Sequence, residues 1–147
     1  YNYRISNICA GIGCGQMDVL NQRIVQKKLI NQFYHEIFKN NNQVILQKPI
    51  NENFKSNFWV SNILFDKSSI YTPEELRKHL EAFNIESRRF WKPMHLQPLF
   101  LDFPFYGSLV AENLFNKGLC LPSGTNLSQE EQQTIKSAID RFFNLKL

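Results

Sequence analysis

The sequence predicts an α/β protein, a two-layer sandwich in which a small, mainly antiparallel sheet carries helices on one face and follows a long helix. Apolar residues recur at helical spacing over residues 5–38. Short runs rich in aromatic and β-branched residues alternate with helical segments, two of which open with capping signals at Thr72 and Ser128. The 147 residues, 43% of them hydrophobic, suffice for one compact domain with its own core.

Composition narrows the class of protein. The net charge of +4 is spread along the chain, which fits a phosphorylated metabolite better than nucleic acid. Cys9, Cys14 and Cys120 are odd in number and lack CxxC spacing, so we expect free thiols in a reducing compartment and no zinc site. No apolar run approaches the roughly 20 residues of a membrane helix, and no signal peptide is present. We therefore expect a cytoplasmic protein without a metal.

The first predicted element is the long amphipathic helix over residues 5–38, with a bend expected near its glycines. Gly11, Gly13 and Gly15 only superficially resemble a dinucleotide-binding GxGxxG, because Gln16 takes the last glycine position and no strand precedes them. The favoured interpretation is that these small residues allow another backbone to approach closely.

The middle of the chain predicts two strands, a helix and a third strand. Residues 44–46 form a short strand, and residues 58–65, rich in aromatic and β-branched side chains, form a central strand. Thr72 caps a helix whose first position is Pro73 and whose capping box ends at Glu75; this helix runs to about Asn84. Residues 85–88 are the next strand.

The last part of the chain predicts two helices around a strand. One helix covers about residues 107–116, and a strand over residues 118–122 ends at its proline. Ser128 opens the final helix with a second capping box. Its inward-facing residues are expected to be Ile135, Ala138, Ile139 and Phe142.

Residues 88–98, RRFWKPMHLQP, have a composition that suits neither a strand nor a helix. Such a segment is expected to line an anion, a planar ligand or a partner surface. Arg88 and Arg89 offer fork-shaped donors for phosphate or carboxylate and Lys92 adds a charge, although solvated surface cations remain an alternative. Trp91 can stack on a base or sugar or join the core, and His95 can serve a site or cap a turn.

Other candidate residues give weaker signals. His35 and His79 lie on helices without convergent ligands, so structural roles are favoured over metal binding. Asn2 and Arg4 lie at the start of the long helix, where free amide groups and the helix dipole favour an anion. The sequence holds no nucleophile–base grouping and no phosphate-binding loop, and thus no complete catalytic set.

Several stretches together resemble the DegT/DnrJ/EryC1/StrS family of pyridoxal-phosphate (PLP) sugar aminotransferases. They are residues 1–8 (YNYRISNI), 10–24, 58–60 (FWV), 72–76 (TPEEL), 85–88 (IESR), 92–98 (KPMHLQP) and 120–125 (CLPSGT). The resemblance covers essentially the whole chain in order. It implies the aspartate-aminotransferase (type I) fold, with residues 1–40 as the connecting helix, residues 41–147 as the C-terminal small domain, and the PLP-binding large domain absent.

The resemblance also implies partners and site residues. The family forms homodimers with shared active sites, and the residue matching Asn2 reaches the phosphate of the neighbouring subunit's PLP, with Arg4 beside it. Arg88, Trp91, Lys92 and His95 would then lie near the nucleotide-sugar substrate. The KPMHLQP motif is most similar to that of members that act on UDP-linked 4-keto-6-deoxy-N-acetylhexosamines, as in surface-glycan pathways. Arg89 replaces a proline that is usual there, which leaves the exact sugar open.

The implied reaction transfers an amino group, expected to come from glutamate, to the keto carbon of the sugar. The family's Schiff-base lysine precedes the segment matching Tyr1, so this chain is expected to hold no catalytic residue and to be inactive alone. The absence of an initiator methionine likewise suggests a piece of a longer chain. Two alternatives stay open: a PLP-dependent sugar dehydratase of the same family, and a non-catalytic remnant that binds nucleotide-sugars or partners.

Overall fold

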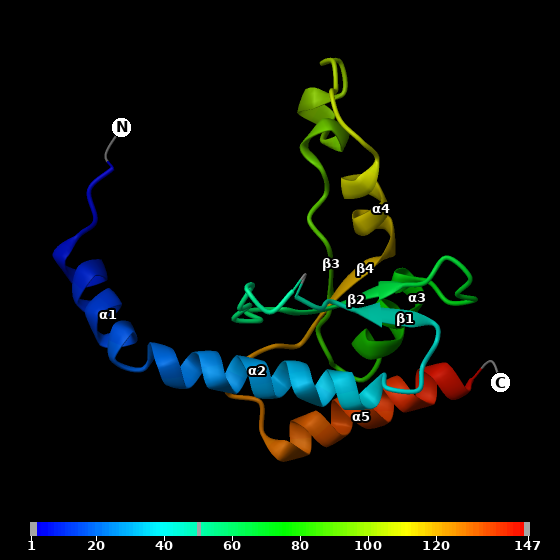
Figure 1. The fold of residues 1–147 in the computed structure, drawn as a ribbon, viewed down its shortest axis with the longest axis horizontal. Coiled ribbons are helices and arrows are strands. Elements are labelled where there is room, and N and C mark those ends of the chain that lie inside the picture. The colour runs from blue at the N-terminus through cyan, green and yellow to red at the C-terminus, as the bar shows by residue number, and fades with distance from the viewer. Residues whose placement is uncertain (1–2, 50, 146–147) are drawn as a thin grey trace.

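The fold is described for residues 3–49 and 51–145 of a computed structural model. The four strands form one sheet, which lies beside long helices, and a segment projects on the other side (Figure 1). The helices are α1 (Asn7–Asp18), α2 (Leu20–Ile37), α3 (Pro73–Glu81), α4 (Val110–Lys117) and α5 (Gln129–Asn144). The strands are β1 (Val44–Leu46), β2 (Ser61–Phe65), β3 (Arg88–Arg89) and β4 (Gly118–Leu121).

The sheet is antiparallel throughout, in the order β1-β2-β4-β3. Ile63 pairs with Leu119 at its centre, and Arg88 pairs with Cys120 at its edge. The central position predicted for the strand that ends at Phe65 is confirmed, and β1 has the predicted bounds.

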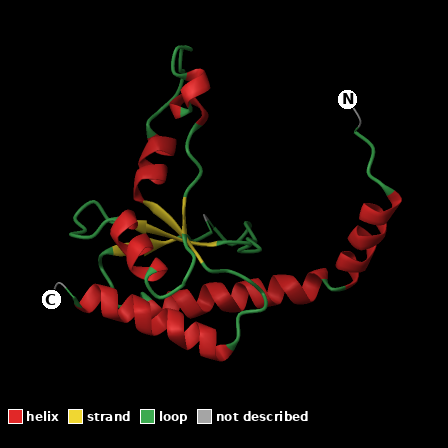
Figure 2. Ribbon diagram, turned by 180° about the vertical axis from the view of Figure 1, so that it is seen from behind, coloured by secondary structure: helices red, strands yellow, loops and turns green. Residues whose placement is uncertain are grey.

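One face of the sheet carries the core, because α2, α3 and α5 cover it (Figure 2). The side chains that alternate along β2 and β4 point into this layer, where the residues of three helices meet them. The fully buried members include Tyr34, Ile63, Leu76, Leu80, Leu119 and Ile139. The inward face predicted for the last helix is confirmed, and both predicted capping boxes form. The α/β class with a small antiparallel sheet is therefore confirmed.

The predicted single long helix is wrong in one respect, because it consists of two helices. The break falls at Val19, whose φ of −108° and ψ of 2° are not helical, and not at the glycines. All 12 residues of α1 stay at least partly exposed, whereas the second half of α2 packs into the core through Ile30, Tyr34 and Phe38. Packing therefore fixes α2, while α1 extends away from the body (Figure 1).

Three predicted boundaries shift for local reasons. Strand β2 starts at Ser61 because Phe58 has a φ of 48°, which is incompatible with a strand. Strand β3 is confined to Arg88–Arg89, since continuing its register would place Glu86 opposite Pro122, which has no N–H to donate. Helix α4 begins at Val110 rather than near Gly107, whose φ of 157° is not helical.

Residues 90–117 form a projection that we call the arm. The chain leaves the sheet after β3, passes two short 3₁₀ turns (Met94–Leu96 and Pro98–Phe100), and returns through α4 to β4 (Figure 1). Gly118 closes the base of the arm: a Cβ there would lie 2.5 Å from the Phe90 ring and 2.6 Å from the Leu114 carbonyl oxygen. Only glycine permits this close approach.

Candidate functional site at the open edge of the sheet

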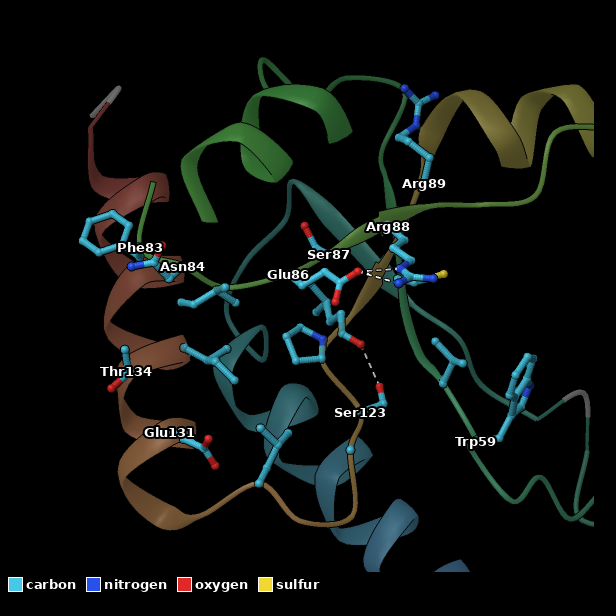
Figure 3. A pocket seen from close by; sticks show the side chains of 18 of the residues that line it. Trp59, Phe83, Asn84, Glu86, Ser87, Arg88, Arg89, Ser123, Glu131 and Thr134 are labelled. Atoms are coloured by element: carbon cyan, nitrogen blue, oxygen red, sulfur yellow. Dashed lines mark hydrogen bonds and ion pairs between the residues drawn. The ribbon is translucent and has the colours of Figure 1, made fainter. Parts of the chain in front are cut away.

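A pocket of about 810 Å³ lies where β3 and β4 separate. Residues 83–91 form one wall, residues 120–124 and the start of α5 form the other, and Trp59 closes one side (Figure 3). The pocket exists because the β3–β4 ladder stops at Arg88 and Cys120, so the two chains diverge beyond that pair. Its volume falls within the range typical of small-molecule sites, about 300–1,000 Å³.

The loop of residues 122–125, which includes part of the second wall of this pocket, is fixed by side chains of α2. The Tyr34 hydroxyl donates to the Pro122 carbonyl at 2.7 Å, and Arg23 donates to the Thr125 hydroxyl at 3.4 Å. The Lys27 ammonium donates to the Ser123 carbonyl and, at 2.9 Å, to the Trp59 carbonyl. Burial lowers the pKa of Lys27, and its amine is held by two backbone carbonyls.

Lys27 was not among the candidate residues that the sequence analysis identified. The available signal was its spacing: Arg23, Lys27 and Tyr34 fall at i, i+4 and i+11, which places them on one side of a helix. That spacing could not identify the partner loop at residues 122–125, because the loop is far away in the sequence. Ser123, for example, follows Lys27 by 96 residues.

Trp59 and Trp91 stack on each other at the mouth of the pocket. Their ring centroids are 5.8 Å apart with an interplanar angle of 28°, although the residues come from different loops. Both remain largely exposed, at 61% and 69%. Phe58, directly before Trp59, has a left-handed φ of 48°, a conformation that costs on the order of 1–3 kcal/mol for a bulky residue.

The two predicted arginines have different surroundings. Both line the pocket. Arg88 forms an ion pair with Glu86, drawn as a dashed line in Figure 3, with 2.6 Å between Nη2 and Oε1. Arg89 donates to the Phe115 carbonyl at 2.8 Å and lies over the Phe115 ring at 5.0 Å. The Arg89 guanidinium thus connects β3 to α4, whereas the Arg88 side chain is 78% exposed and accessible to a pocket ligand.

His95 and Lys92 lie on the arm and do not line the pocket. The His95 ring stacks on Phe105 with centroids 3.7 Å apart, and its Nε2 is 2.9 Å from Glu112 Oε1. This contact joins the 3₁₀ turn of the arm to α4. Lys92 is exposed, and its carbonyl accepts a hydrogen bond from Gln97 at 3.2 Å. The structure therefore brings Arg88 and Trp91 into one pocket, whereas Lys92 and His95, which follow Trp91 along the arm, do not line it.

The remaining candidates lie elsewhere. Asn2 is outside the described residues. Arg4 precedes α1, whose N-terminus is capped by the Ser6 hydroxyl accepting from the Cys9 amide at 3.2 Å. His79 contacts the Ala138 carbonyl at 3.0 Å, the structural role that sequence analysis favoured.

The described residues contain neither a metal-binding cluster nor a membrane-spanning helix. Within residues 3–49 and 51–145, no three His, Cys, Asp or Glu side chains converge as a metal site. No helix in the same ranges is long and apolar enough to cross a membrane. All three cysteines are free thiols, with Cys120 buried.

The fold matches that of one class of protein, the PLP aminotransferases of the type I fold. The profile of the DegT/DnrJ/EryC1/StrS aminotransferase family matches residues 1–140, and the chain belongs to this family. The chain is 34% identical over 98% of its length to the putative pyridoxal phosphate-dependent aminotransferase EpsN of Bacillus subtilis. It is 32% identical over 99% of its length to the GDP-perosamine synthase of Escherichia coli O157:H7.

A solved structure shares the fold. Helicobacter pylori PseC, an aminotransferase involved in the biosynthesis of pseudoaminic acid, superposes with a TM-score of 0.85 over 98% of this chain at 21% identity. The chain spans 37% and 38% of the two sequence relatives and 39% of PseC. Pyridoxal phosphate is the cofactor of this family.

The described residues fit this cofactor in part. Arg4 precedes Ser6, the N-cap of α1, by two residues, and a cation near a helix start suits the phosphate of PLP. Lys27, the lysine that lines the pocket, does not present a free amine, because two carbonyls hold it. The geometry therefore suits contacts to the phosphate better than covalent attachment of the cofactor through this lysine.

Proposed function

We propose that this chain is the C-terminal portion of a PLP-dependent aminotransferase that acts on a 4-keto-6-deoxy nucleotide-sugar. Glutamate would supply the amino group, and a UDP-linked N-acetylhexosamine would receive it at the keto carbon, for surface-glycan biosynthesis. The observation that carries the proposal is the family match across residues 1–140. The names of the relatives support it, because one is described as PLP-dependent and another makes a GDP-linked amino sugar.

The proposal divides the chain into a connecting segment, residues 1–40, and a small domain, residues 41–147. When bound, PLP supplies the electron sink for amino transfer, and the protein contributes binding, orientation and electrostatics. Asn2 and Arg4 would bind the cofactor phosphate of the neighbouring subunit in a homodimer. Because the chain contributes only one wall of such a shared site, we expect the 147-residue chain to be inactive by itself.

The substrate-binding roles follow the two groups of residues. Arg88 and Trp91 line the pocket and would contact the nucleotide-sugar there. Lys92 and His95 lie on the arm, where Lys92 is exposed and His95 is held by Glu112. His95 would therefore position the arm. In a contact with the substrate, the His95 ring would already be oriented by the Glu112 carboxylate. The free thiols support a reducing, cytoplasmic location.

The test uses an enzyme of full family length that contains residues 1–147, loaded with PLP and supplied with glutamate. The UDP-, GDP- and dTDP-linked 4-keto-6-deoxy sugars are offered in turn, and mass spectrometry follows the product. Replacement of the keto oxygen by an amino group on the UDP-linked sugar is the expected result, and amination of only the GDP-linked sugar would overturn the UDP assignment. Loss of water without gain of nitrogen would indicate the dehydratase reaction instead.

A further inference from the structure

We propose that the Trp59–Trp91 pair is the platform on which the nucleobase of the substrate stacks. The inference rests on the proposed function, since it assumes a nucleotide-sugar, and it assigns one end of that substrate to named residues. It also adds Trp59 to the site, a residue that sequence analysis placed in a strand.

The geometry of the pair suits a flat ligand. The two indoles are only 28° from parallel, with centroids 5.8 Å apart. With exposed fractions of 61% and 69%, most of each residue's surface remains accessible to a third ring. Tryptophan rings of this size normally contribute to a core, so two of them stacked in the open at a pocket mouth indicate a contact surface.

Hydrogen bonds in the loop before Trp59 hold this residue in position beside Trp91. The Phe58 amide donates to the Ser56 hydroxyl at 3.1 Å, and the Trp59 amide donates to Asn57 Oδ1 at 3.2 Å. Lys27 donates to the Trp59 carbonyl at 2.9 Å, which connects the loop to α2. A left-handed φ at a bulky residue such as Phe58 persists only where its surroundings determine it, and such residues concentrate at functional sites.

The surroundings of the pair explain why the ligand should be a nucleotide. Arg88, the reachable guanidinium, lines the same pocket as both tryptophans, and fork-shaped donors suit phosphate oxygens. Glu86 now pairs with Arg88 at 2.6 Å, both side chains being more than 70% exposed, so an incoming phosphate can compete for the guanidinium. A planar base beside a phosphate is the combination that defines a nucleotide.

Stacking on an aromatic ring is tolerant of base identity, because every base has a π face. The platform therefore contributes affinity for the nucleotide without choosing between uracil, guanine and thymine. The choice of base would depend on hydrogen bonds from other groups.

The experiment measures binding of UMP, GMP, dTMP and ribose 5-phosphate to the PLP-loaded enzyme of full family length by isothermal titration calorimetry. Trp59→Leu and Trp91→Leu remove one ring each, and Trp59→Phe retains a smaller ring. Phe54→Leu is the matched control, because Phe54 is an exposed aromatic residue, 56% accessible, in the same loop. Near-ultraviolet circular dichroism verifies that each variant is folded.

Each leucine variant should weaken binding of all three nucleotides about 10-fold, the size expected for loss of one base–aromatic stack. Trp59→Phe should lose less, while Phe54→Leu and the affinity for ribose 5-phosphate should not change. Equal nucleotide affinities in the wild type, Trp59→Leu and Trp91→Leu would overturn the platform and leave the proposed function standing. An equal loss for ribose 5-phosphate would likewise overturn it, since that probe has no base. If no nucleotide binds to the wild type, the proposed function itself fails.

Discussion

Lys27 shows how a single side chain can hold two loops of a site together. Its ammonium reaches the Trp59 and Ser123 carbonyls, which belong to two loops that line the pocket. The Ser123 contact is part-buried, so loss of the donor leaves that carbonyl without full compensation from water. The helix α2 therefore contributes to the pocket through Lys27, together with Arg23 and Tyr34, which hold the same loop of residues 122–125.

Replacing Lys27 by methionine should destabilise the protein by about 1–3 kcal/mol, because two carbonyls lose their charged donor while the aliphatic stem is retained. Urea unfolding measures the change. Lys28→Met is the control, because Lys28 is the next residue on the chain and its side chain is exposed. Equal stability of the two variants would show that the two hydrogen bonds contribute nothing measurable.

His95 and Glu112 should control the order of the arm. His95→Ala removes both the contact with Glu112 and the stack on Phe105, so hydrogen exchange of residues 92–109 should accelerate about 10-fold, equivalent to roughly 1.4 kcal/mol. In the full-length enzyme the same change should raise KM for the nucleotide-sugar. His35→Ala, on α2, should leave exchange in the arm unchanged. Unchanged exchange in His95→Ala would assign the order of the arm to other contacts.

At the scale of elements, most boundaries were predictable where local chemistry is strong. The capping boxes at Thr72 and Ser128 define helix starts by side-chain hydrogen bonds within four residues, so the sequence holds the whole signal. The short β3 and the late start of β2 were not predictable. The first depends on Pro122 across the ladder. The second depends on the left-handed φ of Phe58, a backbone angle that the residue type does not reveal.

Gly118 and Gly13 provide a matched pair of substitutions. Alanine at Gly118 would place its Cβ 2.5 Å from the Phe90 ring and 2.6 Å from a backbone oxygen, which should cost about 1–3 kcal/mol and displace the arm. Alanine at Gly13 meets no atom of the described residues within 4 Å and should stabilise α1 by about 0.5–1 kcal/mol. Thermal unfolding measures both. A neutral Gly118→Ala would mean that Phe90 moves freely.

The first turn of α3 should respond to acid. Hydrogen bonds from Arg77, at 2.8 and 2.9 Å, hold the pKa of Glu74 below its usual value. A lowered folded-state pKa means that the stabilisation is complete above the unfolded value near 4.5 and is lost as the pH falls through the folded value. Glu74→Gln should therefore be less stable than the wild type at pH 7, and the difference in stability should narrow as the pH falls below 4.5. A difference that does not narrow in acid would exclude ionisation as its cause.

For the whole molecule, the core was predictable and the site was not. The core residues can be predicted from the periodic spacing of apolar residues within one helix or strand. Ile135 and Ile139 on α5 are an example. The pocket depends on which distant segments meet: Trp59 on Trp91, and Lys27 on Ser123. No local pattern specifies such pairs, so sequence reasoning identified Arg88 and Trp91 by composition and missed their neighbours.

The apolar surface of α1 has the largest consequence for the molecule as a whole. Ile8 and Ile12 are 77% and 62% exposed, and the glycines between and beside them leave open space. Burying one such side chain contributes about 1.5–3 kcal/mol, so this surface favours contact with the large domain or second subunit of the proposed homodimer. The 147-residue chain alone should therefore self-associate and bind a hydrophobic dye.

Size-exclusion chromatography with light scattering, together with dye fluorescence, measures this behaviour. Ile8→Ser with Ile12→Ser should shift the chain towards a monomer and reduce dye binding severalfold, because both changes remove apolar area from the same helix. Ile70→Ser is the control, since Ile70 is 60% exposed but lies in the loop before α3. A wild-type chain that is monomeric and binds no dye would contradict the prediction. It would mean that α1 needs no partner, which would weaken the case for a subunit interface at this helix.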